Sequence, residues 1–146
     1  MKKLQYTIFL FLIGIISLQA QEWQTDFNTA SKEAIENDRP VILVFKGSDW
    51  CAPCIKLDRE VFQTEAFKRY AKDHFVMLEA DFPRKKKNVL PEEQQQKNKQ
   101  LAEKYNRNGI FPFVVILNGE GKVLGETGYL KVTPSEYIRH LESYKG

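Results

Sequence analysis

The chain has 146 residues, of which 42% are hydrophobic and 28% charged, the balance of one folded domain rather than of a disordered chain. Its formal net charge is +3, but Lys2 and Lys3 lie in an N-terminal segment that we expect to be removed. Without these two, 20 lysines and arginines stand against 19 acidic residues, so charge gives no argument for binding to nucleic acid or to an anionic membrane.

The first 20 residues have the pattern of a signal peptide. A pair of lysines precedes an apolar run, 8–16, and Ala20 is a small residue suited to the cleavage position. A retained membrane anchor is the alternative, but the uncharged stretch 4–20 is short for a membrane-spanning helix. No cysteine follows the apolar run, which excludes a lipoprotein anchor. We expect residues 1–20 to be a signal peptide and residues 21–146 an exported domain, in a bacterial periplasm or anchored to the membrane and facing it.

Helices and strands alternate in the first half of the exported domain. A helix over 26–37 has apolar residues at helical spacing and ends before Pro40, because the residue before a proline avoids helical angles. The continuous apolar run 41–45 predicts a strand buried on both faces of a parallel sheet. The other expected elements are a turn (46–49), a helix from Cys51 or Ala52, a helix from an N-cap at Thr64 to residue 72, and a strand (75–80).

The second half begins with a polar loop, 81–90, which carries the basic run Arg84-Lys85-Lys86-Lys87. We expect this run to be a solvated loop, with docking of an acidic partner as the alternative. A helix over 91–105 is polar on all sides in its first half, so it should stand partly off the body. The last elements are strands at 113–117 and 122–127, joined by a turn at 118–121, and a helix over 134–144.

This order of elements predicts an α/β domain. The expected sheet is four-stranded and mixed, with two parallel crossovers and a C-terminal β-hairpin, and it is flanked by helices. Neither an internal repeat nor a second domain is visible in the sequence.

The two cysteines of the chain, Cys51 and Cys54, lie between the strand 41–45 and the helix that follows it. A bridge across two residues closes almost no loop, so it would stabilise the fold little, and the spacing favours redox chemistry over a structural disulfide. Half of a zinc site is the alternative, but zinc usually needs four ligands, and only His74 and His140 are left to join the pair. We therefore expect no metal site.

The chain resembles the thioredoxin superfamily, of the exported protein disulfide reductase type, from about Val41 to Tyr144. Trp50-Cys51-Ala52-Pro53-Cys54 looks like the family's Trp-Cys-x-x-Cys centre, and Gly109-Ile110-Phe111-Pro112 before a strand looks like its second signature. The resemblance implies a thioredoxin-like fold and a cis peptide bond before Pro112, beside the cysteines. A strand-entry proline is the alternative for Pro112.

Cys51 is expected at a helix N-terminus, where free N–H groups and the helix dipole favour a thiolate. We therefore assign Cys51 as the attacking nucleophile and Cys54, shielded one turn further in, as the resolving thiol. The expected substrate-binding residues are Trp50, Ala52, Pro53, Phe111, Pro112 and Gly128. Packing at the sheet edge is the alternative for Trp50, and a turn glycine for Gly128.

The sequence departs from the family at one position. Thioredoxin has a buried aspartate six residues before its first cysteine, facing a lysine on the neighbouring strand, and here Phe45 and Met77 take these positions if the strands are aligned on Asp81. A paired apolar replacement leaves no charge buried alone, but it removes the group thought to accept the proton of the second cysteine. Glu79 is a possible substitute, and a surface position is its alternative.

The most direct interpretation is an exported thiol–disulfide oxidoreductase that reduces protein disulfides. Neither Ala52 nor Pro53 donates a side-chain hydrogen bond to a thiolate, so the potential should lie nearer about −270 mV than about −120 mV. We expect a monomer without cofactor or nucleic acid, supplied with electrons by a membrane-bound thiol reductant. The alternatives are a disulfide oxidase or isomerase, and a non-catalytic module that binds metal, such as copper(I) on two thiolates, or acts as an adaptor.

Overall fold

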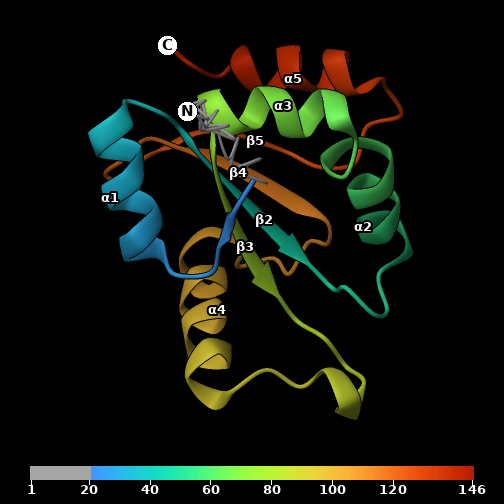
Figure 1. Cartoon of the computed structure of the whole chain (residues 1–146). Coiled ribbons are helices and arrows are strands. Elements are labelled where there is room, and N and C mark those ends of the chain that lie inside the picture. The colour runs from blue at the N-terminus through green and yellow to red at the C-terminus, as the bar shows by residue number, and fades with distance from the viewer. Residues whose placement is uncertain (1–20) are drawn as a thin grey trace, which may run out of the picture.

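The structure is a computed structural model that describes residues 21–146, so the expected signal peptide lies outside the described residues. One sheet forms the centre of the domain, with strand order β1-β3-β2-β4-β5 (Figure 1). The strands are β1 (Trp23–Gln24), β2 (Val41–Lys46), β3 (Val76–Asp81), β4 (Phe113–Leu117) and β5 (Val123–Thr127). The helices are α1 (Phe27–Asn37), α2 (Ala52–Leu57), α3 (Glu65–His74), α4 (Glu92–Tyr105) and α5 (Pro134–Glu142).

The sheet confirms the predicted α/β class and its mixed character, but two details of the prediction were wrong. The sheet has five strands and not four. The prediction missed β1, because a strand of two residues is too short to show an alternating pattern. Strands β1, β3 and β2 are parallel, whereas β4 runs antiparallel to β2. The second parallel crossover therefore runs from β1 through α1 to β2, and not through α4 as predicted. The prediction failed because an apolar run does not reveal the direction of a strand.

Strand β2 lies at the centre of the sheet and is buried on both faces. Ile42 and Val44 pack in a core with α2, α3 and α5, and Val41, Leu43 and Phe45 pack in a second core with α1 and α4 (Figure 1). Each such side chain contributes about 1.5–3 kcal/mol by leaving water. This double burial explains the continuous apolar run and fixes the end of β2, from which the cysteine turn starts.

Side-chain caps begin most of the helices. Asp26 accepts the N–H of Thr29 at the start of α1, and Thr64 accepts that of Phe67 at the predicted start of α3. Thr133 and Glu136 form a reciprocal capping box at α5. After α2, residues Asp58–Phe62 continue as one π-helical turn.

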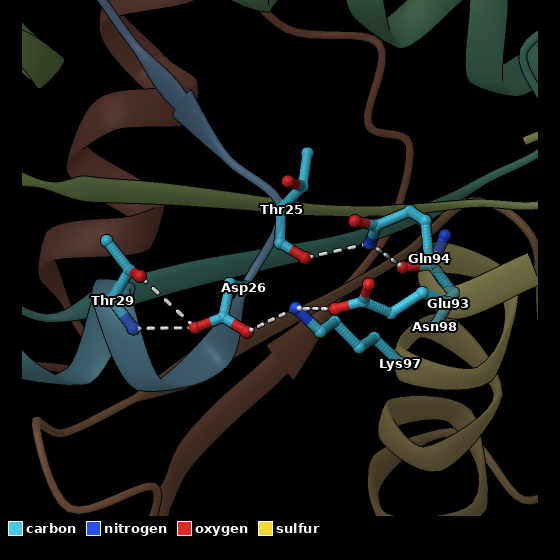
Figure 2. A network of polar contacts seen from close by, with 7 residues as sticks. All are labelled: Thr25, Asp26, Thr29, Glu93, Gln94, Lys97 and Asn98. Carbon is cyan, nitrogen blue, oxygen red and sulfur yellow. Dashed lines mark hydrogen bonds and ion pairs between the residues drawn. The ribbon is translucent and has the colours of Figure 1, made fainter. Parts of the chain in front are cut away.

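Helix α4 packs against the domain instead of standing partly off it. Figure 2 shows Lys97 between the carboxylates of Asp26 and Glu93, at 3.1 and 3.2 Å. Gln94 donates to the carbonyl of Thr25 at 2.8 Å and also to Asn98. The expectation was wrong because these polar side chains make specific contacts, which hydropathy alone does not reveal.

The buried residue Asn98 joins α4 to the sheet. Its side chain is 2% exposed and donates to the carbonyl of Asp81, the last residue of β3, at 2.9 Å. We call residues 82–100, between β3 and β4, the insertion. Its C-terminal end is therefore fixed to the body of the domain. Within residues 21–146, no helix is long and apolar enough to cross a membrane.

Candidate active site

Cys51 and Cys54 form a disulfide in this structure, with their Cα atoms 5.2 Å apart. Strand β2 ends at Lys46, and a turn follows in which the N–H of Cys51 donates to the carbonyl of Gly47 at 2.9 Å. Cys51 is then the N-cap of α2, with Pro53 in the first turn, where a proline removes no helical hydrogen bond. The end of a buried strand and the start of a helix thus fix both sulfurs.

The backbone at the start of α2 is directed at Cys51. The N–H of Cys54 donates to Sγ of Cys51 at 3.3 Å, so a developing thiolate at Cys51 would be stabilised. Cys54 is not more shielded than Cys51, because the two residues are 5% and 4% exposed. The direction of this hydrogen bond, and not exposure, therefore distinguishes the two sulfurs. Ala52 and Pro53 are exposed between them, where a substrate could contact the backbone.

The Phe111–Pro112 peptide bond is cis, and this loop is held by a residue that the sequence analysis missed. The side chain of Asn106 accepts from the N–H of Ile110 and donates to its carbonyl, both at 2.9 Å. Asn106 is only 5% exposed and Ile110 is 47% exposed, so a buried amide fixes the backbone of a residue at the surface. An asparagine just after the helix 91–105 was the only signal in the sequence, and asparagines are common at such ends.

The loop after β5 lies against Pro112. A Cβ added to Gly128 would meet the carbonyl oxygen of Pro112 at 3.2 Å, so the two segments are in close contact. Tyr137 of α5 holds this loop, because its hydroxyl donates to the carbonyl of Gly128 at 2.8 Å. Burial raises the pKa of Tyr137, so its phenol stays protonated as a donor.

Trp50 contacts three segments at once. Its Nε1–H donates to the carbonyl of Phe82 at 2.7 Å, and its ring meets that of Phe111 edge-on, with centroids 5.4 Å apart. The guanidinium of Arg84 lies over the ring at 3.7 Å from its centroid. Gly47 is required beneath the indole, because a Cβ there would collide with it. Trp50 therefore joins the cysteine turn to the Pro112 loop and to the insertion after β3, so the packing expected as an alternative is present.

Asp49 holds the insertion against the cysteine turn. Its carboxylate accepts the backbone N–H of Arg84 at 2.9 Å, that of Lys85 at 3.0 Å and the side-chain amide of Asn88 at 2.9 Å. These bonds, above all that from the backbone of Arg84, lower the pKa of Asp49 to about 2. Ser48 makes a parallel link, donating its N–H and its hydroxyl to the two oxygens of Asp81.

The alignment of Phe45 with Met77 was wrong. Phe45 lies opposite Ala80 in the parallel pair β2–β3, and Met77 lies opposite Ile42 on the other face of the sheet. Phe45 therefore faces a small apolar residue, and aligning the strands on Asp81 misplaced its partner.

The possible substitute Glu79 is half-buried and forms an ion pair with Lys46. The ammonium of Lys46 also lies over the ring of Trp23, 5.4 Å from its centroid. Glu79 is thus not a free surface carboxylate, but its partner is a lysine rather than a cysteine.

The two histidines have other contacts. His74 stacks on Tyr70, and His140 shares a hydrogen bond with Thr127 at 2.8 Å. Within residues 21–146, no group of three or more His, Cys, Asp or Glu side chains could hold a metal ion. The chemistry that this arrangement offers is thiol–disulfide exchange at Cys51 and Cys54.

Comparisons with known proteins agree with this geometry. A family model described as thioredoxin-like matches residues 22–119. The disulfide bond reductase DsbH of Chlamydia pneumoniae is 37% identical over 122 residues, which cover 84% of this chain and 71% of that protein. A solved structure of a DsbH oxidoreductase superposes with a TM-score of 0.79 at 34% identity, covering 98% of this chain and 92% of the other. A thioredoxin from Thermus thermophilus, at 19% identity, covers 85% of this chain and 86% of its own with a TM-score of 0.61, and shows the fold alone.

Proposed function

Because the chain belongs to the thioredoxin-like family and is a thiol–disulfide oxidoreductase of its disulfide-reductase type, we propose that it is exported and reduces disulfides in other proteins. The observation that carries this proposal is the hydrogen bond from the N–H of Cys54 to Sγ of Cys51 at the start of α2. It supports Cys51 as the thiolate that attacks.

The proposed reaction has two exchange steps. The Cys51 thiolate attacks one sulfur of a substrate disulfide, forms a mixed disulfide and releases the first substrate thiolate, which takes up a proton. Cys54 then loses its proton and attacks Sγ of Cys51. This step releases the second substrate thiolate and forms the Cys51–Cys54 disulfide present in the structure. Two electrons pass from the enzyme dithiol to the substrate.

Three segments around the sulfurs would hold the substrate chain. The backbone of Phe111, before the cis bond to Pro112, would hydrogen-bond an extended peptide in the manner of an added strand. Gly128 lies against Pro112, and Trp50 packs on Phe111. Ala52 and Pro53 complete the exposed surface between the two cysteines.

Two observations support reduction over oxidation. The DsbH of Chlamydia pneumoniae, 37% identical, is a disulfide bond reductase. Neither Ala52 nor Pro53 has a side-chain donor that would further stabilise the Cys51 thiolate and make the protein a strong oxidant.

Repeated turnover requires an electron source. Each cycle leaves the Cys51–Cys54 disulfide, which needs two electrons and two protons before it can act again. In an oxidising compartment these would come from a membrane-bound dithiol, and residues 1–20 would be the signal peptide that exports the domain to a bacterial periplasm. We propose that the protein acts there as a monomer.

Reduction of insulin by the domain 21–146 with dithiothreitol as electron source tests the proposal. Wild type should accelerate insulin precipitation, and Cys51→Ser should not. In a separate incubation without dithiothreitol, reduced Cys54→Ser should retain a disulfide-linked substrate at Cys51. Absence of turnover together with stoichiometric metal in the purified protein would favour the metal-binding alternative.

A further inference from the structure

We propose that the loop Arg84–Lys87 docks an acidic segment of the protein whose disulfide is reduced. This inference rests on the proposed function, since it names the chemistry of the partner at the same site. We call Arg84, Lys85, Lys86 and Lys87 the basic loop.

The cations of the basic loop are available to a partner. All four residues are exposed, and the ion pairs within residues 21–146 use other cations, namely Lys46, Lys68, Lys97, Lys99 and Lys145. The carboxylate of Asp49 is occupied by two backbone N–H groups and the amide of Asn88. Four adjacent positive charges therefore face solvent beside the cysteine turn.

The basic loop is fixed at the end nearer the cysteines. Asp49 binds the backbone of Arg84 and Lys85, and Trp50 donates to the carbonyl of Phe82, two residues earlier. Asp49 and Trp50 directly precede Cys51. The position of the loop backbone relative to the sulfur is thus set by side chains of the active-site turn itself.

The other end of the insertion is fixed by α4. Asn98 binds the carbonyl of Asp81. Gln94 and Lys97 bind the segment before α1 (Figure 2). Because the backbone of the basic loop is held at Arg84 and Lys85, less conformational freedom is lost when a partner binds there.

Arg84 is the cation of the basic loop that contacts the active-site turn. Its guanidinium stacks on Trp50, the neighbour of Cys51, at 3.7 Å from the ring centroid. Stacking uses the face of the guanidinium and leaves its N–H edge free to bind a carboxylate with two hydrogen bonds. An aspartate or glutamate near the substrate cysteine would fit this edge.

The charge distribution favours an acidic protein segment over a lipid surface. Cations and acids nearly balance in residues 21–146, and Glu92 and Glu93 follow the basic loop at the start of α4. Attraction to an anionic membrane grows with a broad basic surface, whereas this one is confined to a loop beside the disulfide.

The proposal is tested with three disulfide-bridged peptides. They differ only in the four residues beside one cysteine, which are all Glu, all Gln or all Lys. The readout is the kcat/KM of the Glu peptide divided by that of the Gln peptide. In wild type this ratio should be about ten at low salt and fall toward one at high salt. The kcat/KM of the Lys peptide divided by that of the Gln peptide should lie below one. Loss of all turnover, including that of the neutral 2-hydroxyethyl disulfide, would refute the proposed function instead.

The test variant replaces Arg84, Lys85, Lys86 and Lys87 by Gln, and the ratio should fall to about one. The matched control replaces Lys32, Arg69, Lys72 and Lys122 by Gln, which removes the same four charges from exposed positions of α1, α3 and the β4–β5 turn. Its ratio should stay at the wild-type value. The single variant Arg84→Gln should lower the ratio about threefold.

Three results would overturn the proposal. The first is a ratio near one in wild type, and the second is a ratio that the loop variant keeps. The third is sedimentation of wild type with phosphatidylglycerol vesicles that the loop variant loses, because it would assign the basic loop to a membrane surface.

Discussion

The carboxylate of Asp49 accepts the backbone N–H of Arg84 at 2.9 Å, although the two residues lie 35 positions apart. This bond joins the turn that carries Cys51 to the insertion between β3 and β4. Through it, the redox site and the basic loop are joined in one unit, on which two of the following predictions depend.

Asp49→Asn should weaken this unit and change how stability depends on pH. The folded pKa of Asp49 is about 2, below its ordinary value of 3.8, so ionised Asp49 stabilises the fold above about pH 4, and this contribution is lost as the pH falls toward 2. Urea unfolding of both proteins from pH 6 to pH 2 measures the difference. Wild type should be the more stable at pH 6, and the gap should shrink between pH 4 and pH 2. Curves that stay parallel through this window would contradict the assignment.

Asn106→Ala should destabilise the protein and disturb the Pro112 loop. It removes two part-buried hydrogen bonds, to the N–H and to the carbonyl of Ile110, at a cost of about 1–3 kcal/mol for the pair. Asn108→Ala in the exposed turn nearby is the control and should change the free energy of unfolding by less than about 0.5 kcal/mol. Equal effects of the two substitutions would show that Asn106 does not hold the loop.

Tyr137→Phe should cost about 1 kcal/mol, because it removes the donor to the carbonyl of Gly128 while keeping the ring in the core. Gly128 borders Pro112, so kcat/KM for insulin should fall more than the rate with 2-hydroxyethyl disulfide. Tyr144→Phe removes a longer bond, 3.2 Å to Glu126, and serves as the control. A uniform loss with both substrates would mean that Tyr137 acts through stability alone.

Trp50→Phe should loosen the insertion. The phenyl ring lacks the N–H that binds the carbonyl of Phe82, and it offers Arg84 a smaller surface. Amide hydrogen exchange in residues 82–90 should become faster, while exchange in the strands of the central sheet stays unchanged. Unchanged protection of 82–90 would show that Asp49 alone anchors this segment.

Most of the fold follows from the hydrophobic pattern of the sequence. The run 41–45 predicted a strand buried on both faces, and Thr64 predicted a helix start, because burial and capping leave local signals. The two-residue strand β1 and the antiparallel direction of β4 left none. They depend on pairing between distant segments, which neither local composition nor spacing records.

The residues of the site also divide into those that the sequence reveals and those that only the fold reveals. Cys51, Cys54 and Pro112 stand out in the sequence by residue type and spacing, and the structure brings Pro112 against Gly128. Asp49 and Asn106 do not stand out, because their importance comes from backbone groups that only the folded chain places beside them. The basic loop was visible as a charge run, but its fixed position beside Trp50 was not.

The reduction potential of the Cys51–Cys54 pair tests the central claim most directly. Domain 21–146, equilibrated with glutathione buffers of known ratio and then trapped by alkylation, gives the potential from the fraction of reduced protein. A reductase with Ala52 and Pro53 between its cysteines should have a value near about −270 mV. A value above about −150 mV would identify an oxidant and contradict the proposed direction of electron flow.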